Sequence, residues 1–85
     1  MKPTPIDSVE EEDGILFKVL RVTLGNEIYE ANEFAIPEYY CKVIIKSNFT
    51  TRTHYFNNGV ETSKERIIQD ERIKSLRRWH LKNIL

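Results

Sequence analysis

The 85-residue chain is poor in the residues that usually staple a small protein or shape a phosphate site. It has one cysteine, so an internal disulfide is excluded. Its three glycines lie far apart, which excludes a glycine-rich phosphate loop. No apolar run approaches the roughly 18–20 residues of a membrane span. Residues 10–13 are acidic where a signal peptide needs an apolar core, so we expect a cytoplasmic protein with no membrane partner.

Groups suited to catalysis or metal binding are equally scarce. Cys41, His54 and His80 are the only soft or borderline metal ligands, and their spacing fits no zinc motif. No serine stands in a nucleophile elbow, and nothing in the sequence brings Cys41 beside a histidine. We therefore predict that the chain is not an enzyme and has no metal, no cofactor and no small-molecule substrate.

Charge, in contrast, is abundant and unevenly distributed. Residues 1–40 carry three basic and nine acidic residues, a net charge of −6. Residues 41–85 carry ten basic and four acidic residues, a net charge of +6. Such asymmetry is typical of proteins that contact nucleic acid or an acidic partner. The alternative is internal, with the acidic half of the chain lying beside the basic half.

Residues 1–13 contain two prolines and few apolar side chains, so they are predicted to be a flexible acidic tail. Residues 14–85 are predicted to form a single β-β-β(-β)-α domain. The first strand is Ile15–Leu24, where apolar residues occupy alternate positions. Gly25-Asn26 is the predicted turn into Ile28–Ile36, whose poor alternation is typical of an edge strand.

Two further strands and a helix complete the predicted fold. Tyr39–Lys46 alternates well, and Thr50–Phe56 is rich in β-branched and aromatic residues. After the Asn58-Gly59 turn, Thr62 and Glu65 have the spacing of a capping box, which predicts a helix over residues 62–85. The fold class is therefore α+β, with a three- or four-stranded antiparallel sheet packed by one long C-terminal helix.

The helical periodicity divides that helix into two sides. The side predicted to pack on the sheet carries Ile68, Ile73, Leu76, Trp79, His80 and Ile84. Lys74, Arg78 and Lys82 follow one another at i, i+4, i+8 on roughly the other side. Because like charges at this spacing weaken a helix, we interpret them either as a solvated face or as a site kept for an anionic partner.

The basic residues define the candidate binding site. We expect a small, non-enzymatic regulatory protein that binds an anionic ligand, with nucleic acid preferred, through a basic sheet face or the basic helix stripe. The predicted contacts are Tyr40, Lys42, Lys46, Arg52, His54, Tyr55, Lys74, Arg78 and Lys82.

The alternative is a protein-interaction module or a homodimer. A single helix covers one face of a sheet, so apolar residues on the other face form a patch suited to a protein partner. The residues of this alternative interface are Phe17, Val19 and Ile44 on that sheet face, and Ile67, Leu81 and Leu85 on the helix outside its sheet-facing side.

Overall fold

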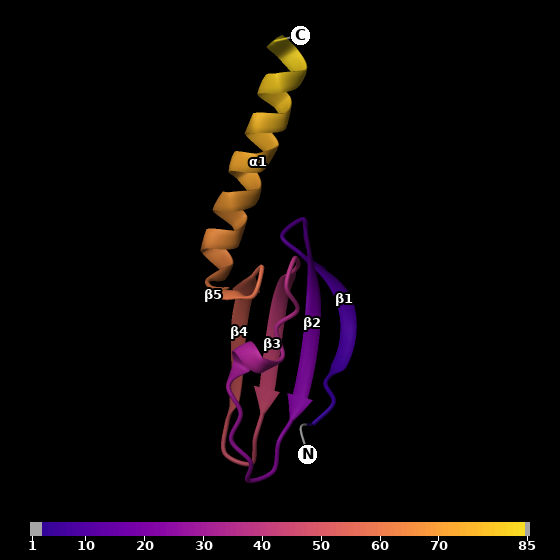
Figure 1. Ribbon diagram of the computed structural model, residues 1–85, viewed down its shortest axis with the longest axis vertical. Coiled ribbons are helices and arrows are strands. Elements are labelled where there is room, and N and C mark those ends of the chain that lie inside the picture. The colour runs from indigo at the N-terminus through magenta and orange to yellow at the C-terminus, as the bar shows by residue number, and fades with distance from the viewer. Residues whose placement is uncertain (1–2, 85) are drawn as a thin grey trace.

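The structure is a computed structural model that describes residues 3–84, with side chains described for residues 3–77. Within residues 3–84 the chain forms a five-stranded sheet, in the order β1-β2-β3-β4-β5, and one α-helix (Figure 1). The α+β class is confirmed. The strands are β1 (Ile6–Glu12), β2 (Ile15–Thr23), β3 (Tyr40–Lys46), β4 (Thr51–Asn57) and β5 (Val60–Thr62). A 3₁₀ turn spans Ala31–Glu33, and α1 spans Lys64–Ile84.

The sheet is mixed rather than antiparallel. β2 pairs with β3 in parallel, while the other three strand pairs are antiparallel. The predicted strand Ile28–Ile36 is wrong because parallel strands need a crossover connection, and residues 24–39 form it. Its irregular alternation suits this role, because Ala31 and Phe34 face the sheet at helical spacing while Asn32 and Glu33 between them remain exposed.

The acidic N-terminal segment also departs from the prediction. Ile6–Glu12 is an edge strand rather than a flexible tail, and it joins β2 through the Asp13-Gly14 turn. Both turn residues have positive φ, 54° and 78°, as a tight hairpin turn requires. Composition underestimates this strand because its pairing depends on β2 and on cross-strand charge, which a low apolar content does not reveal.

The two faces of the sheet hold separate apolar clusters. The crossover face carries Leu20, Val22, Cys41, Val43, Ile45 and Phe56, and residues 29–36 cover it. The helix face carries Ile15, Phe17 and Val19, with Tyr40, Ile44 and Tyr55 at their side. Cys41, Val43 and Ile45 are buried against the crossover rather than against the helix.

The helix begins one residue later than the capping pattern predicts. β5 extends to Thr62, and the Ser63 Oγ accepts a hydrogen bond from the Arg66 backbone N–H at 3.3 Å. Ser63 is therefore the N-cap, and the predicted capping box between Thr62 and Glu65 does not form. The short β5 leaves the helix at the end of the sheet.

From that position, α1 extends beyond the sheet instead of lying across it (Figure 1). Ile67 is buried on the helix face, with an exposed fraction of 1%, and Ile68 packs beside it. Ile73 and Leu76, predicted to pack on the sheet, are 50% and 66% exposed. The side chains of Trp79, His80 and Ile84 lie outside the described residues. Between residues 3 and 84 there is no helix with the length and apolar composition to cross a membrane.

Candidate anion-binding surface

Most basic residues of the sheet are already paired with acids of β1. Lys18 Nζ lies 3.3 Å from Asp7 Oδ2, and Arg21 Nη2 lies 2.7 Å from Glu10 Oε2. The Arg21 guanidinium holds the pKa of Glu10 below its usual range. Both of these pairs lie within residues 1–40, so the internal interpretation of the charge asymmetry depends on Lys42 and Lys64, which pair with Glu12.

Glu12 extends this pairing to the base of the helix. Its Oε1 lies 2.7 Å from Lys64 Nζ, and its Oε2 lies 3.1 Å from Lys42 Nζ. Lys64 also lies 2.9 Å from Asp13 Oδ2. Lys64 first and Lys42 second lower the pKa of Glu12, while the hydrogen bond to Glu12 raises the pKa of Lys42. Lys42 is thus half-buried and neutralised within the fold.

Tyr40 fixes the next turn of the helix against the sheet. Its hydroxyl lies 3.0 Å from Asp70 Oδ2 and 2.8 Å from Glu71 Oε1, and it accepts from Lys74 Nζ at 3.2 Å. Burial first, and then the Glu71 hydrogen bond, raises the pKa of Tyr40 to about 12. Since the hydroxyl and ring are engaged, Tyr40 serves as a structural contact in this state.

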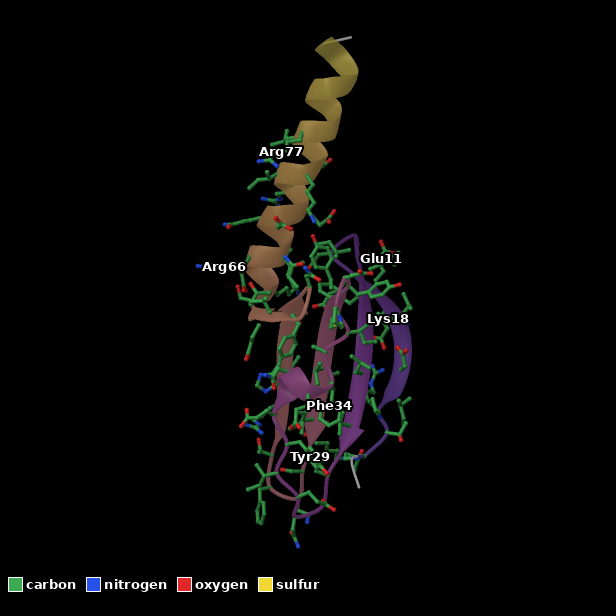
Figure 2. The ribbon with its side chains drawn as sticks, viewed as in Figure 1. Glu11, Lys18, Tyr29, Phe34, Arg66 and Arg77 are labelled. Carbon is green, nitrogen blue, oxygen red and sulfur yellow. The ribbon has the colours of Figure 1, made fainter. Side chains whose placement is uncertain are left out.

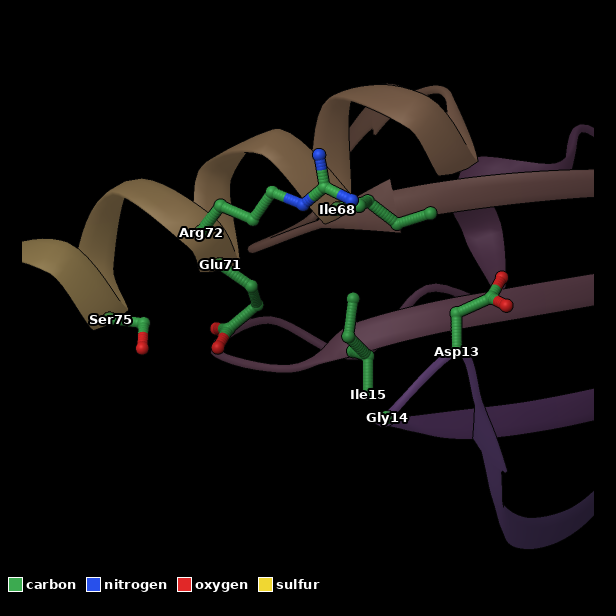
Figure 3. Close-up of a pocket in the computed structure, with 7 residues that line it drawn as sticks. All are labelled: Asp13, Gly14, Ile15, Ile68, Glu71, Arg72 and Ser75. Carbon is green, nitrogen blue, oxygen red and sulfur yellow. The ribbon is translucent and has the colours of Figure 1, made fainter.

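A cleft of about 580 Å³ separates the base of the helix from the β1–β2 turn (Figure 3). Asp13 and Ile15 line it from the sheet side, and Ile68, Glu71 and Arg72 line it from α1. Asp13 pairs with Lys64, and Glu71 accepts from Tyr40. The cleft therefore holds carboxylates that already have partners, next to one arginine.

The remaining predicted site residues do not form one surface. Lys46 and Tyr55 share the helix face, whereas Arg52 and His54 lie on the crossover face, opposite Ile45 and Val43. The His54 Nδ1 lies 3.0 Å from Glu61 Oε2, and its Nε2 is buried without a hydrogen-bond partner.

The Tyr55 ring, a predicted ligand contact, is already packed inside the fold. Its ring packs edge-on against Phe17 at 5.7 Å and lies under Lys42, whose Nζ is 5.8 Å from the ring centroid. A stacked base would have to displace one of these two neighbours. Tyr55 therefore resembles Tyr40 in contributing to the structure of the helix face.

The alternative interface is largely internal. Phe17, Val19 and Ile67 are buried together on the helix face, and Ile44 is half-buried beside them. These residues fill the sheet's own second cluster because the base of α1 covers it, so they offer no open patch. The side chain of Leu81 and the whole of Leu85 lie outside the described residues.

The densest run of basic residues in the sequence lies on the distal helix segment, which we define as residues 72–84 of α1. It contains five basic residues and no acidic residue: Arg72, Lys74, Arg77, Arg78 and Lys82. Lys74 is paired with Asp70 at 3.3 Å. Figure 2 shows Arg66 and Arg77 on the helix, far from Glu11 and Lys18 at the opposite side of the sheet. The side chains of Arg78 and Lys82 lie outside the described residues.

Arg72 and Arg77 are therefore candidate contacts that the i, i+4 stripe leaves out. The signal that identifies them is the lack of any acid beyond Glu71, rather than the spacing of the lysines.

Within the described part of the chain, no group of three or more histidine, cysteine, aspartate or glutamate side chains is arranged to hold a metal ion. Comparison with known proteins finds no matching family model, curated protein or solved structure.

Proposed function

We propose that this chain is a non-enzymatic binding protein that uses the distal helix segment to bind an anionic macromolecule, with nucleic acid as the preferred ligand. The observation that carries the proposal is the contrast between the paired basic residues of the sheet and a helix segment whose sequence contains no acid. Acids of β1 and the β1–β2 turn neutralise Lys18, Arg21, Lys42 and Lys64, whereas no acid follows Glu71 in the helix.

The geometry of the helix supports the same ligand. An α-helix with its side chains is about 10–12 Å across, and the major groove of B-DNA is about 12 Å wide. Because α1 extends past the sheet, the sheet does not lie alongside its distal segment (Figure 1). That segment is therefore narrow enough, and far enough from the sheet, to enter a major groove. Basic side chains along one helix then neutralise phosphates on the groove walls.

The test is fluorescence anisotropy with labelled mixed-sequence duplex DNA and single-stranded RNA at about 50 and 200 mM salt. Three to five phosphate contacts predict a log–log salt slope of about −3 to −4.5 on duplex DNA. The double variant R72Q/R77Q should reduce the magnitude of that slope by about 1.8, the equivalent of two phosphate contacts.

The matched control is K46Q/R52Q, which removes the same charge from the opposite end of the molecule. Lys46 and Arg52 are exposed and lie near the turn between β3 and β4. An unchanged slope in this control assigns the ligand to the helix. Loss of binding in the control but not in R72Q/R77Q would contradict the helix as the site.

A protein partner is the second candidate, and the exposed apolar residues of the distal helix segment favour it. Ile73 and Leu76 are one turn apart and expose 50% and 66% of their surface. An amphipathic helix of this type docks its apolar side in a groove of the partner. Binding by this route should tolerate salt and should fail in I73D or L76D. Nucleic-acid binding should instead depend steeply on salt.

A further inference from the structure

β4 has an open edge along its first four residues. β5 pairs with Tyr55, Phe56 and Asn57 only, so Thr51–His54 have a hydrogen-bonded neighbour, β3, on one side. Within residues 3–84 no strand lies against their other side. Thr51, Arg52 and Thr53 are exposed. β5 therefore lies beside residues 55–57 of β4, and the backbone edge of residues 51–54 is open.

The hydrogen-bond pattern shows which backbone groups face outward. The Thr50 carbonyl accepts from the Ser47 N–H at 2.9 Å, and the Asn58 N–H donates to the Tyr39 carbonyl at 3.3 Å. Even-numbered residues of β4 thus bond to β3, because bonding direction alternates along an antiparallel strand. The N–H and C=O groups of Thr51 and Thr53 must point to the open side.

The two edges of the sheet differ in charge. β1, the other edge, contains Asp7, Glu10, Glu11 and Glu12, a charge density that discourages strand addition. The open part of β4 itself carries no acidic residue, and the acid in contact with it is Glu61 of β5, whose Oε2 lies 3.0 Å from His54 Nδ1 at the end next to β5. Arg52 lies within the open part, and Lys46 lies opposite Thr51 on β3.

From this open edge, we propose that Thr51–His54 accept an extended acidic peptide segment of a partner protein by strand addition. Thr51 and Thr53 supply the backbone hydrogen bonds, and Arg52 selects carboxylates that lie on the crossover face of the added strand. This site is separate from the distal helix segment, and it does not depend on the function proposed for the helix.

The probe is a capped eight-residue peptide of alternating threonine and glutamate, compared with one in which lysine replaces each glutamate. Backbone amides are followed by ¹⁵N-correlated NMR and by hydrogen exchange during titration. We expect the glutamate peptide to shift and protect the Thr51 and Thr53 amides and to leave the Arg52 amide, already bonded to β3, protected as before. The lysine peptide should cause neither change.

Thr53→Pro gives an independent test. Proline removes the outward N–H of residue 53 but no hydrogen bond to β3, so circular dichroism should show a folded sheet. Peptide affinity should fall about tenfold or more in this variant and remain within about twofold in the control Thr53→Val. Arg52→Glu should reverse the preference between the two peptides.

Three outcomes would overturn the proposal. The first is that neither peptide perturbs Thr51 or Thr53 in the wild-type chain, a result that needs no variant to fold. The second is that the glutamate peptide perturbs only α1, which would assign the attraction to the distal helix segment. The third is a molecular mass that doubles as protein concentration rises, together with protection of the Thr53 amide from hydrogen exchange. That result would show that a second copy of the chain occupies the edge.

Discussion

At the scale of single residues, Glu12 determines how the acidic strand, the sheet and the helix are joined. One carboxylate contacts Lys42 of β3 and Lys64 at the start of α1. Its side chain is 29% exposed, so water weakens each ion pair, but the two lysines act on the same group. Their combined effect is a pKa for Glu12 below 4.5 in the folded chain.

This lowered pKa predicts an acid-sensitive contribution to stability. A carboxyl whose pKa falls on folding stabilises the fold fully above its unfolded pKa, near 4.5. That contribution disappears as the pH falls through the lower, folded-state pKa. Glu12→Gln should therefore lower the Tm at neutral pH and flatten its decrease between about pH 5 and pH 3.

Thermal unfolding followed by circular dichroism across this pH range measures the effect. Glu11→Gln is the matched control, because Glu11 is exposed on the same strand and carries the same charge. It should keep the wild-type pH dependence of Tm. Identical curves for wild type and Glu12→Gln would mean that the two lysines do not stabilise the ionised carboxylate.

At the scale of elements, α1 consists of a packed base and a distal segment with different roles. Ile67 and the Tyr40 contacts hold the first turns on the sheet. Ile73 and Leu76, farther along, are exposed. Isolated helices of about 12–15 residues are marginal in water, so the distal segment depends on the packed base for continuity and gains stability from any ligand that covers it.

This division predicts unequal costs for two similar truncations in the same helix. Ile67→Ala removes a buried side chain and should lower the free energy of unfolding by about 2–5 kcal/mol. Leu76→Ala, at an exposed position, should change it by less than about 0.5 kcal/mol. Urea denaturation of both variants compares the two costs. A large loss for Leu76→Ala alone would show that the distal segment folds back onto the sheet.

At the scale of the whole molecule, the extended helix makes the protein elongated. Its radius of gyration is 15.5 Å and its extents are 57 × 21 × 19 Å. A compact domain of this length has a radius of gyration of about 12 Å. The elongation separates the basic distal helix segment from the open edge of β4, so the two proposed sites lie far enough apart to hold different partners.

Small-angle scattering of the dilute protein checks this shape. We expect a radius of gyration of at least about 15 Å, with no change on dilution. A value near 12 Å would show a helix packed along the sheet. The same measurement with saturating duplex DNA should increase the radius if the ligand lies along the distal segment, because the added mass is remote from the sheet.

The elements that have local signals are predicted correctly from the sequence. Alternation in Ile15–Leu24, Tyr39–Lys46 and Thr50–Phe56 matches β2, β3 and β4 to within one residue at each end, because each strand has a buried face. The Asn58-Gly59 turn and the long C-terminal helix also follow from local chemistry. The charge division between the two halves of the chain is readable without a structure, although its meaning is not.

Features that depend on residues distant in the sequence could not be predicted, because they follow from how the elements pack. β2 pairs with β3 in parallel, so residues 24–39 form a crossover. The acidic segment becomes a strand because it pairs with β2 and because four basic side chains lie beside it and its turn. Helical periodicity identifies an apolar stripe but cannot fix what the stripe faces. The three-residue β5 sets the helix at the end of the sheet, so Ile67 is buried and Leu76 is exposed.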